Sequence, residues 1–363
     1  MNIIHILRGK AIPESKNSIN RVVYTLAANQ VEAGNDVTIW GLHNDAIHNY
    51  PPRNFKTILF KTGFLGLWLS KSLLKQLNQL KTTDMVHLHG TFNLECLLLA
   101  YRLIKKNIPF IYTPYCSSAR RHRIIKLPIT KWIIDQLELY VMKHAKMVQF
   151  VQSFELEWYK DAEINASYIP VGQHVHHLQF KFSPVLIEEY PVFATLYLKE
   201  HDTGGLLTII HAFELYKRAG GMGELWIITD VNDYKSIKND ISRSGIEKFS
   251  RFMFYTTEQE KLNLIANTTW MVAMNAKDIL PLHVLETLAI QVPVIVNEQS
   301  DLADKIVAYQ AGYNIGEPTP VALCKTFIHA YYEVNRAREL GKNGYRLVLR
   351  EYNWNKIIEQ FNH

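Results

Sequence analysis

The sequence contains few cysteines. Its 363 residues include three, Cys96, Cys116 and Cys324, which lie far apart and form no C-x-x-C pair. A small, odd number of distant cysteines predicts neither a disulfide framework nor a zinc site. A reducing cytosol is the simplest compartment for this cysteine usage, so we expect a cytoplasmic protein.

Long hydrophobic runs are also missing. No apolar stretch approaches the ~18 residues that span a bilayer. The opening residues, MNIIHILRGK, have too short an apolar run for a signal peptide, and no small-residue cleavage site follows. Repeats at solenoid periods and low-complexity tracts are absent as well. We therefore expect a globular protein that can lie on a membrane but does not cross one.

Neither sign of charge dominates the sequence, and the excess of positive charge is small. Lys and Arg number 40 and Asp and Glu number 34, which gives a formal net charge of +6. This excess is too weak and too evenly spread to indicate nucleic-acid binding. It suits an anionic partner, such as a phosphate-bearing ligand or an acidic membrane surface.

Short β-rich runs alternate with helical patterns along the whole chain. The first half predicts strands over 2–7, 36–41, 85–88, 109–112 and 147–151, and helices over 18–33, 64–80, 93–106 and 127–145. The second half predicts strands near 192–198, 224–229, 252–255, 270–274 and 293–296, and helices near 205–218, 258–267 and 282–291. This alternation predicts parallel βαβ units. Two such sets predict two doubly wound α/β domains that bind ligands at the carboxyl ends of their strands.

The boundary between the two domains is predicted near 170–190. Residues 169–184 lose periodicity and gather Pro, Gly and polar side chains. We expect a first domain over 1–175 and a second over 185–340. The end of the chain, 341–363, is expected to form a helix that packs back on the first domain.

The segment 271–296, MVAMNAKDILPLHVLETLAIQVPVIV, carries the most chemical information. A strand leads into a loop with Asp278, and a helix that starts near Leu282 carries Glu286 in its second turn. The free N–H groups and the dipole of a helix N-terminus suit a phosphate, and a carboxylate can accept hydrogen bonds from a ribose diol. The alternative is a loop or capping carboxylate at Asp278 and a solvated helix residue at Glu286. Spacing alone favours this alternative, because such carboxylate pairs are common.

Several motifs in order strengthen the functional interpretation. The run DILPLHVLETLA followed by PVIV resembles the E-x7-E signature of retaining glycosyltransferases of family four. Further segments resemble other parts of that family: NRVVYTLA (20–27), DMVHLHG (84–90), TPYC (113–116), IPVG (169–172) and REYNWNKIIEQF (350–361). The resemblance covers nearly the whole chain. It implies the GT-B fold, in which two Rossmann-like doubly wound domains face each other across a cleft.

The resemblance implies a nucleotide-diphosphate sugar donor in the second domain. Glu286 would hold the donor ribose, and Asp278 would face the donor sugar, as catalytic residues. Leu282 and His283 would present backbone N–H groups to the diphosphate, and Lys199 falls where the family has a phosphate-binding Arg. The family uses no D-x-D metal site and none occurs here, so we expect no metal and no cofactor.

The first domain would supply the loop at Asn17 and Ser18 to the donor, and His89 and Tyr115 to the acceptor side. His89 is also a candidate catalytic residue. A histidine beside a buried strand is, however, roughly twice as often a satisfied core residue as a catalyst.

Some positions depart from the family pattern. Asn17-Ser18 replaces Gly-Gly, where side-chain bulk hinders a close approach of backbone to phosphate. Thr203-Gly204 replaces a Lys, Ile279 replaces a Gly, Tyr115 replaces a His, and Asp278 is one methylene shorter than Glu. Two hypotheses follow: an active transferase, and a catalytically degenerate transferase-like subunit that binds or scaffolds other proteins. The retained charges at Asp278, Glu286 and Lys199 favour the active enzyme.

Two segments combine basic and apolar residues. Residues 61–77 (KTGFLGLWLSKSLLKQL) and 120–131 (RRHRIIKLPITK) suit contact with anionic lipid, or equally a core-facing helix with a basic outer face. Membrane contact would fit transfer of a hexose or N-acetylhexosamine to a glycan or lipid-linked acceptor. Such a reaction occurs in the synthesis of bacterial capsule, lipopolysaccharide or exopolysaccharide.

Overall fold

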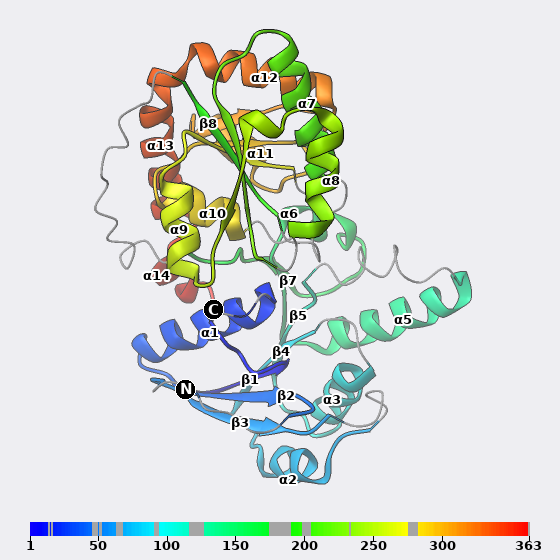
Figure 1. Ribbon diagram of the computed structural model, residues 1–363. Coiled ribbons are helices and arrows are strands. Elements are labelled where there is room, and N and C mark those ends of the chain that lie inside the picture. The colour runs from blue at the N-terminus through cyan, green and yellow to red at the C-terminus, as the bar shows by residue number, and fades with distance from the viewer. Residues whose placement is uncertain are drawn as a thin grey trace. The chain divides into compact units, whose positions relative to one another are not determined.

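The computed structural model divides the chain into two compact units (Figure 1). It describes residues 1–13, 15, 17–45, 50, 53–62, 68–90, 94–115, 127–173, 190–197, 205–231, 234–274 and 282–361. The first unit comprises Met1–Gly172 and Trp354–His363, and the second comprises Gln173–Asn353. The division falls just after Gly172, within the segment that lost its periodicity in the sequence.

The first unit is built on a parallel sheet. Its seven described strands have the order β3-β2-β1-β4-β5-β6-β7. The central strand β1 buries every residue from Ile3 to Leu7, as expected for a parallel strand that is covered by helices on both faces. The strands are β1 (Asn2–Arg8), β2 (Asp36–Leu42), β3 (Lys56–Phe60), β4 (Met85–His89), β5 (Phe110–Thr113), β6 (Met147–Phe150) and β7 (Ala166–Tyr168). All except β3 and β7 were predicted from the sequence.

The helices of the first unit follow the strands in the βαβ manner. They are α1 (Ser18–Glu32), α2 (Lys71–Gln79), α3 (Leu94–Lys105), α5 (Pro128–His144), α6 (Ser153–Trp158) and α14 (Trp354–Glu359). One apolar cluster joins β1, β2, β4, β5 and β6 to α2, α3 and α5. No described helix is long and apolar enough to span a bilayer.

Helix α2 is shorter than the predicted 64–80. The described residues before it, Trp68 to Ser70, are not helical, and the helix begins at Lys71. Ser70 is the N-cap, because its hydroxyl accepts a hydrogen bond from the Leu73 N–H at 3.4 Å. The apolar pattern before Ser70 therefore does not continue into the helix.

The second unit repeats the architecture with a parallel sheet whose six described strands have the order β10-β9-β8-β11-β12-β13. The strands are β8 (Val192–Leu196), β9 (Glu224–Thr229), β10 (Ser250–Phe254), β11 (Trp270–Ala273), β12 (Val294–Val296) and β13 (Gly312–Asn314). The helices are α7 (Gly205–Arg218), α8 (Tyr234–Ser244), η3 (Glu247–Phe249), α9 (Glu258–Ala266), α10 (Leu282–Ala289), α11 (Ala303–Ala308), α12 (Pro320–Tyr332), η4 (Val334–Arg336) and α13 (Ala337–Glu351).

The strand order reverses once in each sheet. In the first unit β1 lies between β2 and β4, and in the second unit β8 lies between β9 and β11. Such a switch point leaves room for a ligand at the carboxyl ends of the two strands. Helix α10 follows β11 and therefore belongs to the switch point of the second unit. The two predicted doubly wound domains are confirmed.

The C-terminal segment 341–363 is divided between the units, rather than packing as one piece on the first domain. Helix α13 packs on α10 within the second unit, whereas α14 packs on α1 in the first. Two glycines bring α13 against α10. A Cβ at Gly341 would collide with the carbonyl oxygen of Gln291, and one at Gly344 would meet the Leu288 side chain. This close packing fixes α13 to the second unit.

Gly341→Ala should destabilise the protein by about 2 kcal/mol, because the added methyl group must displace a backbone carbonyl. At an exposed position inside a helix, a Gly→Ala change instead stabilises a protein by about 1 kcal/mol. The sign of the change in unfolding free energy therefore shows whether Gly341 is closely packed. Urea unfolding measures the effect, with Lys342→Ala at the exposed neighbouring position as the control. An unchanged or raised urea midpoint in Gly341→Ala would contradict the packing.

Candidate functional site

Helix α10 carries a buried carboxylate in its second turn. Seven of its eight residues are buried, and Glu286 is only 4% exposed. The ammonium group of Lys261 on α9 lies 2.9 Å from Glu286 Oε2. A carboxylate is tolerated at such depth only when it is paired or hydrogen-bonded. The burial excludes the interpretation of Glu286 as a solvated helix residue.

Lys261 is itself 2% exposed, and it is among the largest fully buried side chains of the described residues. It also contacts the carboxylate of Glu258, three residues earlier on α9. The start of α9 is fixed by a capping box between Thr257 and Glu260. One buried cation thus binds two carboxylates from two packed helices.

The sequence analysis did not identify Lys261 as a buried residue, although the helical spacing indicates it. It lies four residues before Ile265, which is fully buried, and residues at this spacing share one face of a helix. A lysine on the buried face of an amphipathic helix requires an anionic partner. The acidic Glu286 on the neighbouring helix is that partner.

The first residues of α10 are the ones predicted to bind a diphosphate. Leu282 begins the helix and is 8% exposed, and His283 follows, half-buried. The N–H groups in the first turn of an α-helix have no acceptor within the helix itself. The predicted partners Asp278 and Lys199 lie outside the described residues, as do Ile279 and Thr203-Gly204.

In the first unit, Asn17 and Ser18 form the start of α1. Ser18 is the first helical residue and Asn17 is the N-cap. The side-chain oxygen of Asn17 accepts hydrogen bonds from the N–H groups of Ile19 at 3.0 Å and Asn20 at 3.4 Å. The residue that replaces a family glycine therefore caps the helix.

Asn20 organises the loop between β1 and α1. Its buried side-chain oxygen accepts hydrogen bonds from the N–H groups of Lys10 at 2.9 Å and Ala11 at 2.8 Å. Ala11 has a φ of 45°, and Gly9, with a φ of 142°, packs so closely that any Cβ would collide with Asn20. Two backbone donors of this loop thus point at a protein side chain. Nothing in the sequence pattern distinguishes Asn20 from a solvated helix residue.

A chain of hydrogen bonds connects His89 to the core of the first unit. His5 Nε2 lies 2.6 Å from Gln30 Oε1, which can only accept, so His5 is protonated at Nε2. His89 Nε2 then donates to His5 Nδ1 at 2.9 Å, and the Tyr115 hydroxyl donates to His89 Nδ1 at 2.9 Å. Both ring nitrogens of His89 are occupied and the side chain is 1% exposed. The structure therefore places His89 inside the unit as a satisfied core residue.

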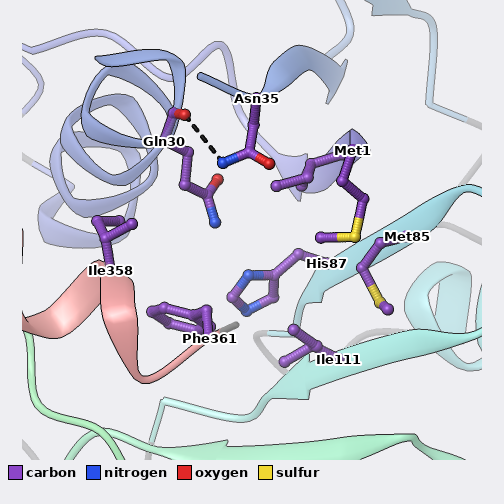
Figure 2. A pocket seen from close by; sticks show the side chains of 9 residues that line it. Met1, Gln30, Asn35, Met85, His87, Ile111, Ile358 and Phe361 are labelled. Carbon is purple, nitrogen blue, oxygen red and sulfur yellow. Dashed lines mark hydrogen bonds between the residues drawn. The ribbon is translucent and has the colours of Figure 1, made fainter. Parts of the chain in front are cut away.

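A parallel chain orients His87. The Thr113 hydroxyl donates to Gln149 Oε1 at 2.8 Å, so it accepts from His87 Nε2 at 2.7 Å, and Gln149 in turn donates to the Ile169 carbonyl at 2.9 Å. His87 Nδ1 has no hydrogen-bond partner among the described residues. Figure 2 shows the His87 ring among the side chains that line a small pocket, which include Gln30 and Phe361.

His5, His87 and His89 are close enough for one nitrogen of each to lie within 4.8 Å of the others. Their geometry, however, serves the hydrogen-bonded chains. His5 Nδ1 and His89 Nε2 are engaged in a hydrogen bond with each other, and the His87 and His89 rings stack with their centroids 4.0 Å apart. We assign the cluster a structural role.

Tyr115 follows β5 with a φ of 52°, in the left-handed region that non-glycine residues rarely adopt. Its side chain is 7% exposed, and burial raises the pKa of its hydroxyl. The hydrogen bond to His89 and the buried ring hold this conformation in place.

Burial lowers the pKa of His5 to about 4 and holds those of His87 and His89 well below 6.5. Unfolding restores an ordinary histidine pKa. Between pH ~6.5 and ~4 the unfolded chain therefore binds more protons, and stability falls as the pH falls. Each such histidine contributes up to about 1.4 kcal/mol per pH unit to this loss of unfolding free energy.

His5→Gln should show a shallower loss of unfolding free energy between pH 7 and pH 5 than the wild type.

Urea unfolding at several pH values measures this slope, and His211→Gln, at an exposed position, is the control. A His5→Gln slope equal to that of the wild type would refute the buried neutral cluster.

Lys261→Met should destabilise the protein by about 3 to 5 kcal/mol, because it leaves a buried carboxylate without its cation. Lys325→Met, at an exposed position on α12, should change stability by less than about 0.5 kcal/mol. Chemical unfolding followed by circular dichroism compares the two. Equal urea midpoints would show that the Lys261–Glu286 pair does not support the second unit.

Comparison with known proteins agrees with this architecture. Residues 19–172 match the family model described as Glycosyltransferase Family 4. Among proteins of curated function, none matches the chain by sequence.

Solved structures resemble the chain over its full length. Sucrose-phosphate synthase of Thermosynechococcus elongatus has a TM-score of 0.78 at 16% identity, covering 100% of this chain and 97% of its own. HepE of Anabaena, solved in complex with UDP and glucose, has a TM-score of 0.73 at 12% identity, with coverages of 100% and 98%. WaaG, a glycosyltransferase involved in lipopolysaccharide biosynthesis, has a TM-score of 0.70 at 12% identity, with coverages of 99% and 98%. The chain therefore has the GT-B fold, and residues 19–172 match glycosyltransferase family four.

Proposed function

We propose that this chain is a retaining glycosyltransferase. It transfers a hexose or N-acetylhexosamine from a nucleotide-diphosphate sugar to a glycan or lipid-linked acceptor. The reaction belongs to bacterial surface polysaccharide synthesis and takes place in the cytoplasm at the inner face of the cell membrane. Support comes from the GT-B fold, the family-four match over 19–172, and the UDP and glucose complex of the structurally similar HepE.

The observation that carries the proposal is the buried carboxylate of Glu286. It lies in the second turn of α10, the helix that follows β11 at the switch point of the second sheet. The ammonium group of Lys261 binds its Oε2 at 2.9 Å and fixes the carboxylate in place. An ionised carboxylate held in this way is suited to accept hydrogen bonds from a ribose diol.

The donor phosphates would bind where helix α10 begins. In this proposal the N–H groups of Leu282 and His283 face the diphosphate, since a helix N-terminus attracts negative charge. Lys199 supplies a further positive charge, and Asp278 faces the donor sugar. Such fixed dipoles and charges favour departure of the nucleotide diphosphate, and the proposal includes no metal.

On the acceptor side, the proposal assigns contact with the acceptor to Tyr115. His89 is too deeply buried to touch a substrate, and its hydrogen bond orients the Tyr115 hydroxyl. His89 is therefore a positioning residue in this scheme.

One observation favours the alternative of a degenerate, scaffolding subunit. The loop between β1 and α1 directs its Lys10 and Ala11 N–H groups at Asn20, and Asn17 caps α1. These donors are not available to a ligand in this conformation. The scaffold alternative predicts that no nucleotide binds.

Calorimetric titration with a panel of nucleoside diphosphates separates the two functions. We expect one nucleotide to bind selectively. Glu286→Gln should weaken that binding about 10- to 100-fold, because a neutral amide replaces a charged acceptor. Glu258→Gln is the matched control: it also removes a carboxylate from Lys261, but not from α10, and should bind nearly as the wild type.

A flat titration for every nucleotide would favour the scaffold. Selective binding that Glu286→Gln leaves unchanged would remove Glu286 from the donor site.

A further inference from the structure

Helix α13 carries a row of basic side chains on its exposed surface. The row consists of Arg338, Lys342, Arg346 and Arg350, which follow one another at intervals of four residues and are all exposed. Residues at this spacing are neighbours on one face of a helix. We call these four residues the α13 basic row. Like charges at this spacing destabilise a helix, so the stability of α13 does not explain the row.

The α13 basic row has few carboxylate partners. Within the part of the chain that the structure describes, Arg338, Lys342 and Arg346 form no ion pair. Glu339, an acidic residue of the same helix, pairs with none of these three side chains. The positive charge of the row is therefore largely uncompensated by neighbouring side chains, and it suits an anion from outside the chain.

The C-terminal half of the row borders a surface hollow. The hollow has a volume of about 460 Å³ and is lined by Ala308, Tyr309, Asn343, Arg346 and Arg350. Sites for small molecules commonly have volumes of roughly 300–1,000 Å³. Arg346 and Arg350 supply positive charge from α13, and Ala308 and Tyr309 form the side that belongs to the end of α11. The hollow therefore has the size of a small-molecule site and a basic wall.

Hydrogen bonds orient the side chains of this wall. Asn343 Nδ2 donates to the Gln310 carbonyl at 3.2 Å, and Arg346 Nη1 donates to Asn343 Oδ1 at 3.1 Å. This contact engages one N–H group of a guanidinium that has five. The helix beneath is fixed as well, because Gly341 and Gly344 let α13 pack closely against its neighbours. A site on a fixed helix with an oriented side chain is prepared for a ligand.

The carboxylate of Glu351, at the end of α13, has partners of its own on the α11 side. Lys305 Nζ lies 3.4 Å from Glu351 Oε2, and the Tyr309 hydroxyl donates to Oε1 at 2.9 Å. Glu351 is also absent from the residues that line the hollow. Lys305 thus offsets the negative charge of Glu351, and the arginines give the hollow an excess of positive charge.

The spacing of Arg346 and Arg350 selects the class of ligand. Each guanidinium is a planar fork of N–H groups that matches the oxygens of a phosphate group. Residues four apart on a helix have Cβ atoms about 5–6 Å apart, so two forks can reach two linked anionic groups. A diphosphate has two such groups. The concave shape favours a small molecule over a flat anionic surface.

The hollow lies away from the candidate donor site. Tyr309 is three residues before Gly312, the first residue of β13, so it lies near the amino end of that parallel strand. Helix α10 begins instead after the carboxyl end of β11. The two ends of the strands lie at opposite edges of a parallel sheet, so the hollow is a separate site.

We propose that the hollow beside α13 is a second anion site, which binds the diphosphate group of a small molecule between Arg346 and Arg350. The inference goes beyond the proposed function and does not depend on it. The diphosphate can be free pyrophosphate or part of a nucleotide, since the hollow recognises the chemistry that both share.

Modification of arginine by phenylglyoxal, followed peptide by peptide with mass spectrometry, tests the proposal on the full chain. Inorganic pyrophosphate at a few millimolar should slow the modification of Arg346 and Arg350 about fivefold, because phosphate oxygens engage the reactive N–H groups. Arg338 belongs to the same row but not to the hollow, and its rate should stay unchanged. Orthophosphate at the same concentration should protect less, because it has one anionic group.

Two variants of the same row provide a matched pair. In Arg346→Gln, pyrophosphate should no longer protect Arg350, because one of the two forks is missing. In Lys342→Gln, which removes a charge outside the hollow, Arg350 should be protected as in the wild type. Both positions are exposed, and circular dichroism melting checks that the variants are folded.

A comparison with UDP separates the two sources of a diphosphate. Equal protection by UDP and pyrophosphate is expected, whereas protection by UDP alone would overturn recognition through the diphosphate. Glu286→Gln, which alters the candidate donor site, should leave the protection of Arg346 unchanged. Loss of protection in that variant would show that the effect comes from the donor site.

Three further results would overturn the proposal. They are unchanged modification of Arg346 and Arg350 in pyrophosphate, equal protection of Arg338, and full protection of Arg350 in folded Arg346→Gln. The second result would reduce the row to a diffuse attraction for anions.

Discussion

The candidate site depends on one buried ion pair, between Lys261 and Glu286. A carboxylate in the interior of the second unit would be destabilising by itself, and the pairing with Lys261 on α9 makes it tolerable. The pair also links α9 to α10, while Gly341 and Gly344 allow α13 to pack closely against α10 from another side. The helix that carries the carboxylate is thus held by packing and by charge, a requirement for a residue that must bind a ligand in a defined geometry.

In the first unit, buried polar side chains are satisfied by hydrogen bonds between neutral groups. His5, His87 and His89 sit on the central strands, fully buried, and each keeps a neutral ring by donating one proton to a neighbouring acceptor. The result is a rigid polar core that ends at the Tyr115 hydroxyl. Electrostatics in the second unit and neutral hydrogen bonds in the first are two ways to satisfy buried polar groups.

Much of the fold was predictable from the sequence because buried parallel strands and amphipathic helices have clear periods. Among the elements that were missed, the strands β3 and β7 are mostly only partly buried, and helix α8 has just two buried apolar residues, Ile237 and Ile241, among polar ones. The site was harder. Glu286 was proposed from a motif and its site role stays a prediction, whereas Lys261 and Asn20 have partners 25 and 10 residues away, and such pairings have no local signature. The division of the C-terminal segment between the two units was also missed. Gly341 and Gly344 allow α13 to pack closely within the second unit, and only the packed structure shows these contacts.

The central claim is that a nucleotide-sugar donor binds the second unit where α10 begins and where Glu286 is held by Lys261. Hydrogen–deuterium exchange, followed by mass spectrometry with and without the best-binding nucleoside diphosphate, tests it most directly. The account predicts slower exchange in peptides that span Leu282–Ala289, because a bound diphosphate engages the first N–H groups of that helix. Slowed exchange confined to the first unit, with α10 unchanged, would contradict it.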